Sequence, residues 1–363
     1  MDAARALTGD DNGMDIREIS VDGWRKIIHA RDAGSGLDAL IAVHDATLGP
    51  GCGGCRVFPY ASFDDALTDV KNLSRGMTYK NALAGMPFGG GKAVIIANPR
   101  TDKTPEMFHA FGHALNSLEG LYFTAEDSGM AEADLLAVLE VSPYAAGVVR
   151  DGKGGNPAPF TARGVWRGMQ AAARVKTGAE SLKDMRVSIL GVGAVGMALA
   201  ALLHEEGAHL TVADVNEDAL KEAQSQFGAT LVRPEEAVAA DVDIFSPCAL
   251  GGSINAQTLP ALKAEIVAGA ANNQLATPDM DAALKERNIL YAPDFAINAA
   301  GVISVDLEIL GQWSADEMTR RCDAIGDTIE EICVRAAREN RPTGAVADEM
   351  ALEIIARGAV AAE

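Results

Sequence analysis

Strand-like patterns dominate the first part of the chain. Apolar and β-branched residues fill residues 24–32 and 37–47, and a Gly-rich turn separates the two stretches. Residues 53–60 and 93–99 are also rich in apolar residues and contain or follow Gly. Apolar runs bounded by turn residues predict β-strands at all four places.

Helical spacing marks two other stretches of the same half. Residues 62–83 begin with Ser62 and acidic residues, and residues 104–118 carry Pro105 near their start. In both stretches apolar residues recur at helical intervals, which predicts two helices. Gly and Pro become dense between residues 142 and 159, where the periodicity stops. We therefore expect a loop there that links two domains.

The second half has a different rhythm, in which short apolar stretches alternate with helical ones. This alternation predicts βαβ units and a mostly parallel sheet. The predicted strands lie at residues 186–190, 209–214, 242–247, 265–270 and 289–294. The tail predicts two helices, at residues 314–339 and 347–362.

These patterns together predict an α/β protein with two domains. The first would comprise residues 1–147, and the second, with a doubly wound sheet, would comprise residues 148–335.

Composition and charge narrow the function classes. The 363 residues are 48% hydrophobic and 23% charged, which suits a protein with sizeable cores. The net charge of −20 would repel phosphate, which argues against nucleic acids and anionic membranes as partners. No signal peptide or membrane-length apolar run is apparent, and the five cysteines are an odd number. We therefore expect a cytoplasmic protein in a reducing compartment.

A glycine-rich turn in the second half predicts a dinucleotide site. Residue Gly191 ends a predicted strand, Gly193 would allow a pyrophosphate to approach, and Gly196 would allow close helix packing. Ala194 and Val195 complete the turn, and Asp214 ends the next strand, where an acid receives ribose hydroxyls. The alternative is a Gly-rich turn in another doubly wound domain. Because no Arg or Lys directly follows Asp214, we expect NAD rather than NADP.

The segment 76–92 contains two lysines among glycines and small apolar residues. A phosphate loop is excluded, because Met86 and Ala93 stand where that motif needs Gly and Ser or Thr. Two surface lysines would be the simple alternative. Lys92 argues against it, because this residue lies between a glycine run and a predicted buried strand.

The third interpretation gives the two lysines different roles in one active site. A small substrate with a carboxylate needs one fixed cation, which Lys80 could supply, while Lys92 could transfer protons. Glu126 and Asp127 offer an acid that could handle protons on nitrogen or water. The pair Cys52 and Cys55 has no second C-x-x-C to complete a zinc site, so we expect no metal.

Several long motifs resemble those of one enzyme family. They are GGCRVFPYASFDDAL, LSRGMTYKNALAGMPFGGGK, TAEDSGM, GNPAPFTARGV, GVGAVG, PCALGG, AGAANNQL and YAPDFAINAAGVI. In this order they are similar to the leucine, phenylalanine and valine dehydrogenases, within the superfamily that includes glutamate dehydrogenase. The likeness runs from about residue 24 to the C-terminal helices. It implies a substrate-binding and catalytic first domain and a Rossmann-type NAD-binding second domain, with a C-terminal helix, at about residues 336–363, that returns to the first domain.

The resemblance implies roles for individual residues. Lys80 would hold the substrate α-carboxylate, assisted by the backbone of Gly53 and Gly54. Lys92 would be the catalytic lysine that activates water or takes a proton, and Asp127 would shuttle protons at the amino nitrogen. The implied reaction is reversible oxidative deamination of an amino acid with NAD, in a homo-oligomer.

On the cofactor side, the resemblance implies four further contacts. Asn273 would orient the substrate near the nicotinamide, and Thr161 would meet the carboxamide of the cofactor. Cys248 and Ala249, in PCALGG, would lie beside the cofactor. Ala300 replaces the first Gly of the family's N-A-G-G motif and adds a methyl group close to the expected nicotinamide.

Four positions bear on the substrate side chain. Glutamate dehydrogenases carry Lys where this chain has Cys52, so a buried glutamate carboxylate would be unpaired here. Ala125, Val302 and Val305 resemble the apolar pocket of leucine dehydrogenases, whereas Cys52 is smaller than the leucine usual at its position, which would enlarge the pocket. We expect a branched-chain substrate of the leucine, valine or isoleucine type. The alternatives are an aromatic amino acid such as phenylalanine, or a non-catalytic NAD-binding regulator.

Overall fold

The computed structural model describes residues 5–6, 13–148 and 156–362. The chain divides into two compact units. The first consists of Met1–Gly155, Ser304–Trp313 and Leu352–Glu363, and the second of Asn156–Ile303 and Ser314–Ala351. Residues 149–155, which are part of the expected linking loop, lie outside the described residues. The predicted domain boundary, between residues 147 and 148, lies just before them.

The first unit is built on a mixed eight-stranded sheet with the order β1-β2-β3-β4-β7-β5-β8, in which β6 also pairs with β7. Pairing is antiparallel from β1 through β4 to β7, and parallel among β5, β6, β7 and β8. The strands are β1 (Arg5–Ala6), β2 (Asp15–Glu18), β3 (Lys26–Asp32), β4 (Leu37–Asp45), β5 (Gly51–Cys52), β6 (Cys55–Phe58), β7 (Gly89–Ile96) and β8 (Tyr122–Phe123).

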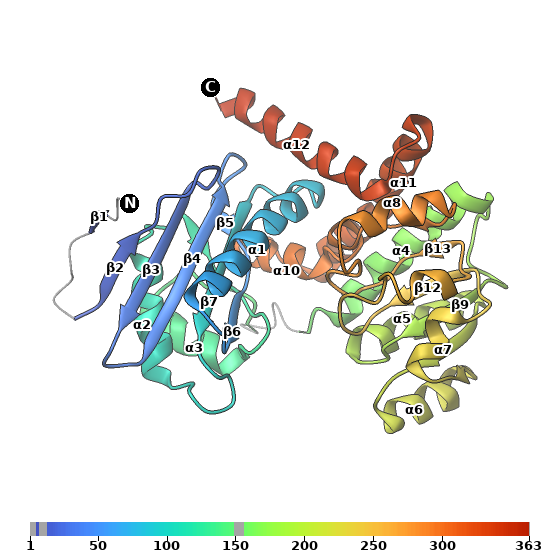
Figure 1. Ribbon diagram of the computed structural model, residues 1–363, viewed down its shortest axis with the longest axis horizontal. Coiled ribbons are helices and arrows are strands. Elements are labelled where there is room, and N and C mark those ends of the chain that lie inside the picture. The colour runs from blue at the N-terminus through green and yellow to red at the C-terminus, as the bar shows by residue number, and fades with distance from the viewer. Residues whose placement is uncertain (1–4, 7–12, 149–155, 363) are drawn as a thin grey trace. The chain divides into compact units, whose positions relative to one another are not determined.

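Helices cover both faces of this sheet (Figure 1). Alternate residues of a strand point to opposite faces. Leu40 and Val94 accordingly pack toward α1 (Phe63–Leu83), whereas Ile41 and Ile95 pack toward α2 (Pro105–Asn116) and α3 (Glu132–Val141). Ser62 caps the start of α1 by accepting a hydrogen bond from the Asp65 N–H, as its acidic first turn suggested.

The second unit contains a fully parallel six-stranded sheet with the order β11-β10-β9-β12-β13-β14. Its strands are β9 (Arg186–Leu190), β10 (His209–Ala213), β11 (Thr230–Leu231), β12 (Ile244–Pro247), β13 (Ile266–Val267) and β14 (Leu290–Tyr291). All four residues of β12 are buried, as expected for a strand covered on both faces. The five strands predicted from the alternating pattern are confirmed, and β11 was not predicted.

Helices alternate with these strands. They are α4 (Ala158–Thr177), α5 (Ala194–Glu206), α6 (Glu217–Phe227), α7 (Pro234–Ala239), η1 (Leu259–Ala261), α8 (Asp279–Glu286), α9 (Asp294–Ile297) and α11 (Ala315–Glu339). Helices α4 and α11 are joined by a bidentate pair between Arg163 and Asp323, with both nitrogen–oxygen distances at 2.9 Å.

Two helices extend across the division between the units. Helix α10 (Ala300–Ile309) contributes its residues from Ser304 onward to the first unit, and α12 (Thr343–Ala362) contributes its residues from Leu352 onward. Within the described part of the chain, no helix combines the length and apolar character needed to cross a bilayer.

A pair of helical glycines provides a test of the fold. A Cβ atom at Gly196 would lie 2.0 Å from the carbonyl oxygen of Gly191, whereas a Cβ atom at Gly76 would meet no atom within 4 Å. We expect Gly196→Ala to destabilise the ligand-free protein by about 1–3 kcal/mol through overpacking. We expect Gly76→Ala to stabilise it by about 0.5–1 kcal/mol through helix propensity.

Denaturant midpoints at one fixed protein concentration would measure both effects. Equal midpoints for the two variants would contradict the close packing of the glycine-rich turn against α5.

Candidate active site

Lys92 lies inside strand β7, which begins at Gly89, and not ahead of a strand that begins at residue 93 as the sequence suggested. Its partner in the sheet is Ala42 of β4. Because Lys92 and Val94 are two residues apart, both point to the face that α1 covers. Lys92 is only 6% exposed. The fold therefore places an ammonium group in an almost dry environment, where a charge needs a partner.

Asp127 provides that partner. Its Oδ2 atom lies 2.8 Å from Nζ of Lys92 and 3.4 Å from Nε of Arg56. Burial of the carboxyl raises its pKa, but the ammonium of Lys92 and then the guanidinium of Arg56 lower it by more, so the pKa of Asp127 lies below its usual range. The carboxyl is thus held ionised at neutral pH, next to the most buried lysine of the site.

A second layer of contacts fixes Arg56. Its NH1 atom lies 2.9 Å from Oδ2 of Asp69 on α1, and the same oxygen accepts a hydrogen bond of 2.5 Å from the hydroxyl of Tyr60. Arg56 therefore bridges two carboxylates, one in the candidate site and one on the helix that covers it. Arg56 stands in the quoted GGCRVFPY motif, but its position beside Asp127 could not be deduced from spacing.

Lys80 lies in the last turn of α1. Three residues earlier, Met77 packs so closely against Gly53 that a Cβ atom there would lie 2.9 Å from Cγ of Met77. One residue later, the buried Asn81 donates a 2.5 Å hydrogen bond to the carbonyl of Gly89. Residues three apart share a helix face, so Lys80 lies on the side of α1 that meets Gly53.

Gly53 and Gly54 form a tightly packed segment beneath this helix. A Cβ atom at Gly53 would lie 2.2 Å from the carbonyl oxygen of Gly91, and one at Gly54 would lie 2.9 Å from Cβ of Asp127. The Gly53 N–H donates to the carbonyl of Phe123 at 3.2 Å. The buried hydroxyl of Tyr122 donates to the carbonyl of Gly53 at 2.6 Å. These contacts keep the segment close to the pair of Lys92 and Asp127.

Three of the four predicted pocket residues lie in the first unit. Cys52 is buried and pairs with Gly90 and Phe123 across two neighbouring strands. A Cβ atom at Gly147 would lie 3.7 Å from Cβ of Ala125 and 3.6 Å from Cγ2 of Val305, so both side chains border the same backbone. The fourth residue, Val302, belongs to the second unit.

Helix α10 also brings an acid that the sequence analysis missed. Asp306 is fully buried and lies beside the thiol of Cys52. Burial raises the pKa of Asp306 to about 8, although the thiol lowers it somewhat. The only signal in the sequence is an acid within the largely apolar stretch 302–309, which also contains Ser304 and Glu308, and such a signal is weak without knowledge of the fold.

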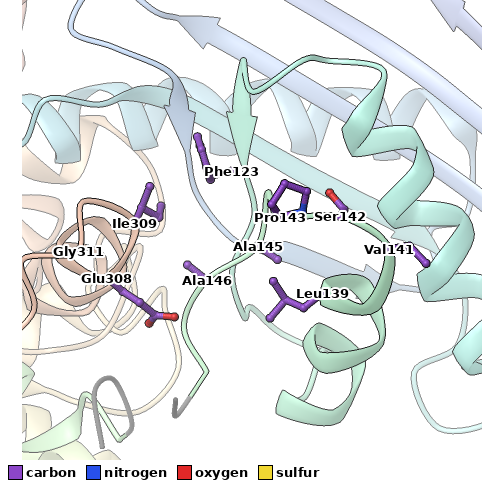
Figure 2. Close-up of a pocket in the computed structure, with 10 residues that line it drawn as sticks. All are labelled: Phe123, Leu139, Val141, Ser142, Pro143, Ala145, Ala146, Glu308, Ile309 and Gly311. Atoms are coloured by element: carbon purple, nitrogen blue, oxygen red, sulfur yellow. The ribbon is translucent and has the colours of Figure 1, made fainter. Parts of the chain in front are cut away.

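A cavity of about 640 Å³ adjoins the same helix (Figure 2). Phe123, Ala145, Ala146 and Ile309 form part of its apolar wall, and Glu308 supplies its charge. A carboxylate oxygen of Glu308 accepts a 3.0 Å hydrogen bond from the N–H of Gly147. This bond ties α10 to the backbone that borders Ala125 and Val305.

The second unit contains the predicted glycine-rich turn, at the carboxyl end of β9. Gly191 has a φ of 103°, which residues with a side chain rarely adopt, and a Cβ atom there would lie 2.7 Å from Ala249. A Cβ atom at Gly193 would meet nothing within 4 Å, so its backbone is open to a ligand. Helix α5 starts at Ala194, and Val195 lies in its first turn. This arrangement fits a dinucleotide pyrophosphate at a helix N-terminus.

Asp214 follows β10, next to this turn. Its two oxygens accept hydrogen bonds from the N–H groups of Val192 (2.7 Å) and Asn216 (2.9 Å). Each oxygen keeps a second lone pair, so the carboxylate can still accept a ribose hydroxyl. Because β9 has β10 on one side and β12 on the other, these groups lie where doubly wound sheets bind ligands.

The remaining predicted cofactor residues also belong to the second unit. Cys248 and Ala249 directly follow β12, and the N–H of Cys248 donates to the carbonyl of Leu190 at 2.8 Å. Asn273 is exposed and has a φ of 52°, and Thr161 is half-buried in the first turn of α4. Ala300 is buried, and its methyl group would be 3.8 Å from a Cβ atom at Gly164.

Metal ligands were also sought. Among the residues that the structure describes, no group of three or more His, Cys, Asp or Glu side chains could hold a metal ion. All five cysteines are free thiols.

Comparison with known families identifies relatives over both units. The family described as Glu/Leu/Phe/Val dehydrogenase, dimerisation domain, matches residues 26–141. The family described as Glutamate/Leucine/Phenylalanine/Valine dehydrogenase matches residues 212–361. A leucine dehydrogenase from Geobacillus stearothermophilus is 46% identical over 333 residues, which cover 92% of this chain and 90% of the relative. The predicted resemblance is therefore confirmed.

A second relative is similar in both sequence and structure. In sequence, an L-tryptophan dehydrogenase from Nostoc punctiforme is 41% identical over 337 residues, covering 93% of this chain and 94% of the relative. The crystal structure of the L-tryptophan dehydrogenase from this organism matches with a TM-score of 0.83, covering 93% of this chain and 97% of that chain. The two-domain α/β fold is thus confirmed.

Proposed function

Because the chain belongs to the Glu/Leu/Phe/Val dehydrogenase family, we propose that it deaminates an apolar L-amino acid oxidatively and reversibly. The products are the 2-oxo acid, ammonia and the reduced cofactor. Substrates of the leucine, valine or isoleucine type agree with the leucine dehydrogenase among the relatives. The observation that carries this proposal is the buried pair of Lys92 and Asp127, whose charged atoms are 2.8 Å apart.

NAD is the proposed cofactor, held by the turn of Gly191, Gly193 and Gly196 and by Asp214. When bound, NAD would supply a hydride acceptor, so that loss of hydride from Cα would convert the substrate amine into an imine. The acidic carboxyl of Asp214 and the absence of a basic residue directly after it favour a free ribose hydroxyl over a 2′-phosphate. Thr161, Cys248, Ala249 and Asn273 are proposed to complete this site on the nicotinamide side.

Lys92 and Asp127 are proposed to handle the protons. Once Lys92 has passed its own proton to Asp127, its neutral amine takes a proton from the water that attacks the imine carbon. Asp127 gives its proton to the amino nitrogen, and ammonia leaves as the new hydroxyl group loses its proton to solvent and becomes the carbonyl of the 2-oxo acid. A proton can move between the two side chains across 2.8 Å. Their combined charge is zero whether the proton is on the ammonium or on the carboxyl, so the transfer adds no net charge to a buried site.

Lys80 is proposed to hold the α-carboxylate of the substrate, beside the backbone of Gly53 and Gly54. Cys52, Ala125, Val302 and Val305 are proposed to surround its side chain. A glutamate side chain is disfavoured there, because Cys52 offers no cation and Asp306 lies beside it. We also propose a homo-oligomer, because residues 26–141 match a dimerisation domain, and a cytoplasmic location, because all five thiols are free.

A substrate panel is the direct test of this function. NADH formation from NAD would be measured with leucine, valine, isoleucine, phenylalanine, tryptophan and glutamate. We expect the highest kcat/KM for the aliphatic amino acids and the lowest for glutamate. Preference for phenylalanine or tryptophan would replace the branched-chain assignment with an aromatic one. If no amino acid of the panel gave NADH although the protein still bound NAD, the proposed activity would be overturned.

Replacement of Lys92 tests the proposed proton transfer. We expect Lys92→Ala to lower kcat by at least about 10²–10⁴-fold, the usual contribution of a positioned acid or base. NAD affinity, measured by fluorescence titration, should stay within about twofold, since Lys92 lies outside the Rossmann-type unit. Lys221→Ala, on the exposed face of α6, is the matched control and should keep wild-type kcat. A near-normal kcat in Lys92→Ala would refute this role.

Replacement of Arg56 tests how Asp127 is kept ionised. The guanidinium favours the charged carboxyl, so its loss in Arg56→Gln should raise the pKa of Asp127. If catalysis needs ionised Asp127, the acidic limb of the pH profile of kcat/KM should then move to higher pH. Arg56→Lys keeps the charge and should leave that limb nearer its wild-type position. If the acidic limb of Arg56→Gln lay at the same pH as that of Arg56→Lys and of the wild type, this electrostatic role would be excluded.

A further inference from the structure

Asp306 is a buried carboxyl, and the thiol of Cys52, a weak donor, is the one described side chain that acts on it. It lies on α10, has no exposed surface, and neither of its oxygens accepts a hydrogen bond from a nitrogen or oxygen donor of the described residues. Native proteins rarely leave such a group unsatisfied, because an unpaired buried polar group costs free energy. A position of this kind calls for a ligand or a function.

The surroundings of Asp306 place it beside the candidate active site. The thiol of Cys52 is its neighbour, and burial, followed by Asp306, raises the pKa of that thiol, whereas Lys92 lowers it. The Cys52 thiol therefore lies close enough to interact electrostatically with both the carboxyl of Asp306 and the ammonium of Lys92. The preceding residue of the helix, Val305, borders the same backbone as Ala125.

Among the residues that the structure describes, no cation acts on the carboxyl of Asp306. Burial dominates its environment and raises its pKa to about 8, and the thiol of Cys52 is the only other group in this part of the chain that affects it. At neutral pH the carboxyl is therefore mostly protonated, with one O–H donor and free acceptor lone pairs. A purely hydrocarbon side chain packed here would leave those lone pairs unused, whereas an N–H or O–H group would satisfy them.

We propose that Asp306 is a specificity-determining residue of the side-chain pocket: its carboxyl raises the kcat/KM of substrates whose side chain ends in an N–H or O–H donor, relative to hydrocarbon side chains of the same size, above the ratio that the apolar walls alone would give. This inference rests on the proposed deamination of L-amino acids in the site of Lys92 and Asp127. It adds a polar group to the part of the pocket formed by the first unit, where the other proposed walls, Ala125 and Val305, are apolar.

The test uses substrates matched in size. Norvaline, homoserine and 2,4-diaminobutyrate have side chains of equal length that end in a methyl, a hydroxyl and an amino group. Norleucine, 5-hydroxynorvaline and ornithine form the same set with one more methylene. For each set, kcat/KM of each donor substrate is divided by that of the hydrocarbon. The ratio is then compared between the wild type and Asp306→Ala, which cancels the solvation of the substrates in water.

We expect the ratio for at least one donor in one set to fall by about tenfold or more in Asp306→Ala, the effect of one buried hydrogen bond. Asp306→Asn, whose amide can still accept and donate, should retain most of the wild-type ratio. Because both substrates meet the same enzyme preparation, partial misfolding of a variant lowers both rates and leaves the ratio unchanged.

Asp281→Ala is the matched control. Asp281 is also a buried acid, but it lies on α8 in the second unit and accepts a hydrogen bond from the N–H of Ala345. Its loss should leave every ratio unchanged. A change below tenfold for all four donor substrates in Asp306→Ala would overturn the inference, even if norvaline and leucine are good substrates. Failure of the wild type to turn over any of these amino acids would instead overturn the proposed function.

Discussion

The site depends on a charge that the fold has buried. Strand β7 places Lys92, at 6% exposure, on a face of the sheet that α1 covers, and an ammonium in such a place is costly without an anion nearby. Asp127 supplies the anion at 2.8 Å, and its own charge is supported by Arg56, which Asp69 holds in turn. Each group in this chain of contacts stabilises the charge of the one before it, from the sheet to the covering helix.

The small residues around this pair follow from the same constraint. The segment at Gly53 approaches the backbone of Gly91 so closely that a Cβ atom would lie 2.2 Å from a carbonyl oxygen. Tyr122 secures it by a hydrogen bond to its carbonyl, and Asn81 secures the glycines of β7 from α1. The backbones of this segment and of β7 are thus held in close contact, and the polar side chains that hold them are themselves hydrogen-bonded.

Much of this could be predicted from the sequence, and the exceptions have physical causes. The five strands of the parallel sheet are continuous apolar runs, so they were predicted correctly, whereas β11, with two residues, carries too little pattern. Strand β7 was predicted to begin after Lys92 because Gly-Gly-Gly is typical of a loop, yet sheet pairing on both sides overrides that propensity. The contact between Asp306 and Cys52 joins distant parts of the chain, and no local pattern encodes it.

Asp127 and Asp306, both in the first unit, show how the environment sets the chemistry of a carboxyl group. Asp127 has two cations beside it and a pKa below the usual range, whereas Asp306 has none and a pKa of about 8. Burial acts on both in the same direction, so the difference comes from the neighbouring charges. A carboxyl that stays ionised can exchange protons with Lys92, and a carboxyl that stays neutral can recognise a neutral donor without repelling it. Environments that push two pKa values apart in this way are typical of sites where each acid has a separate task.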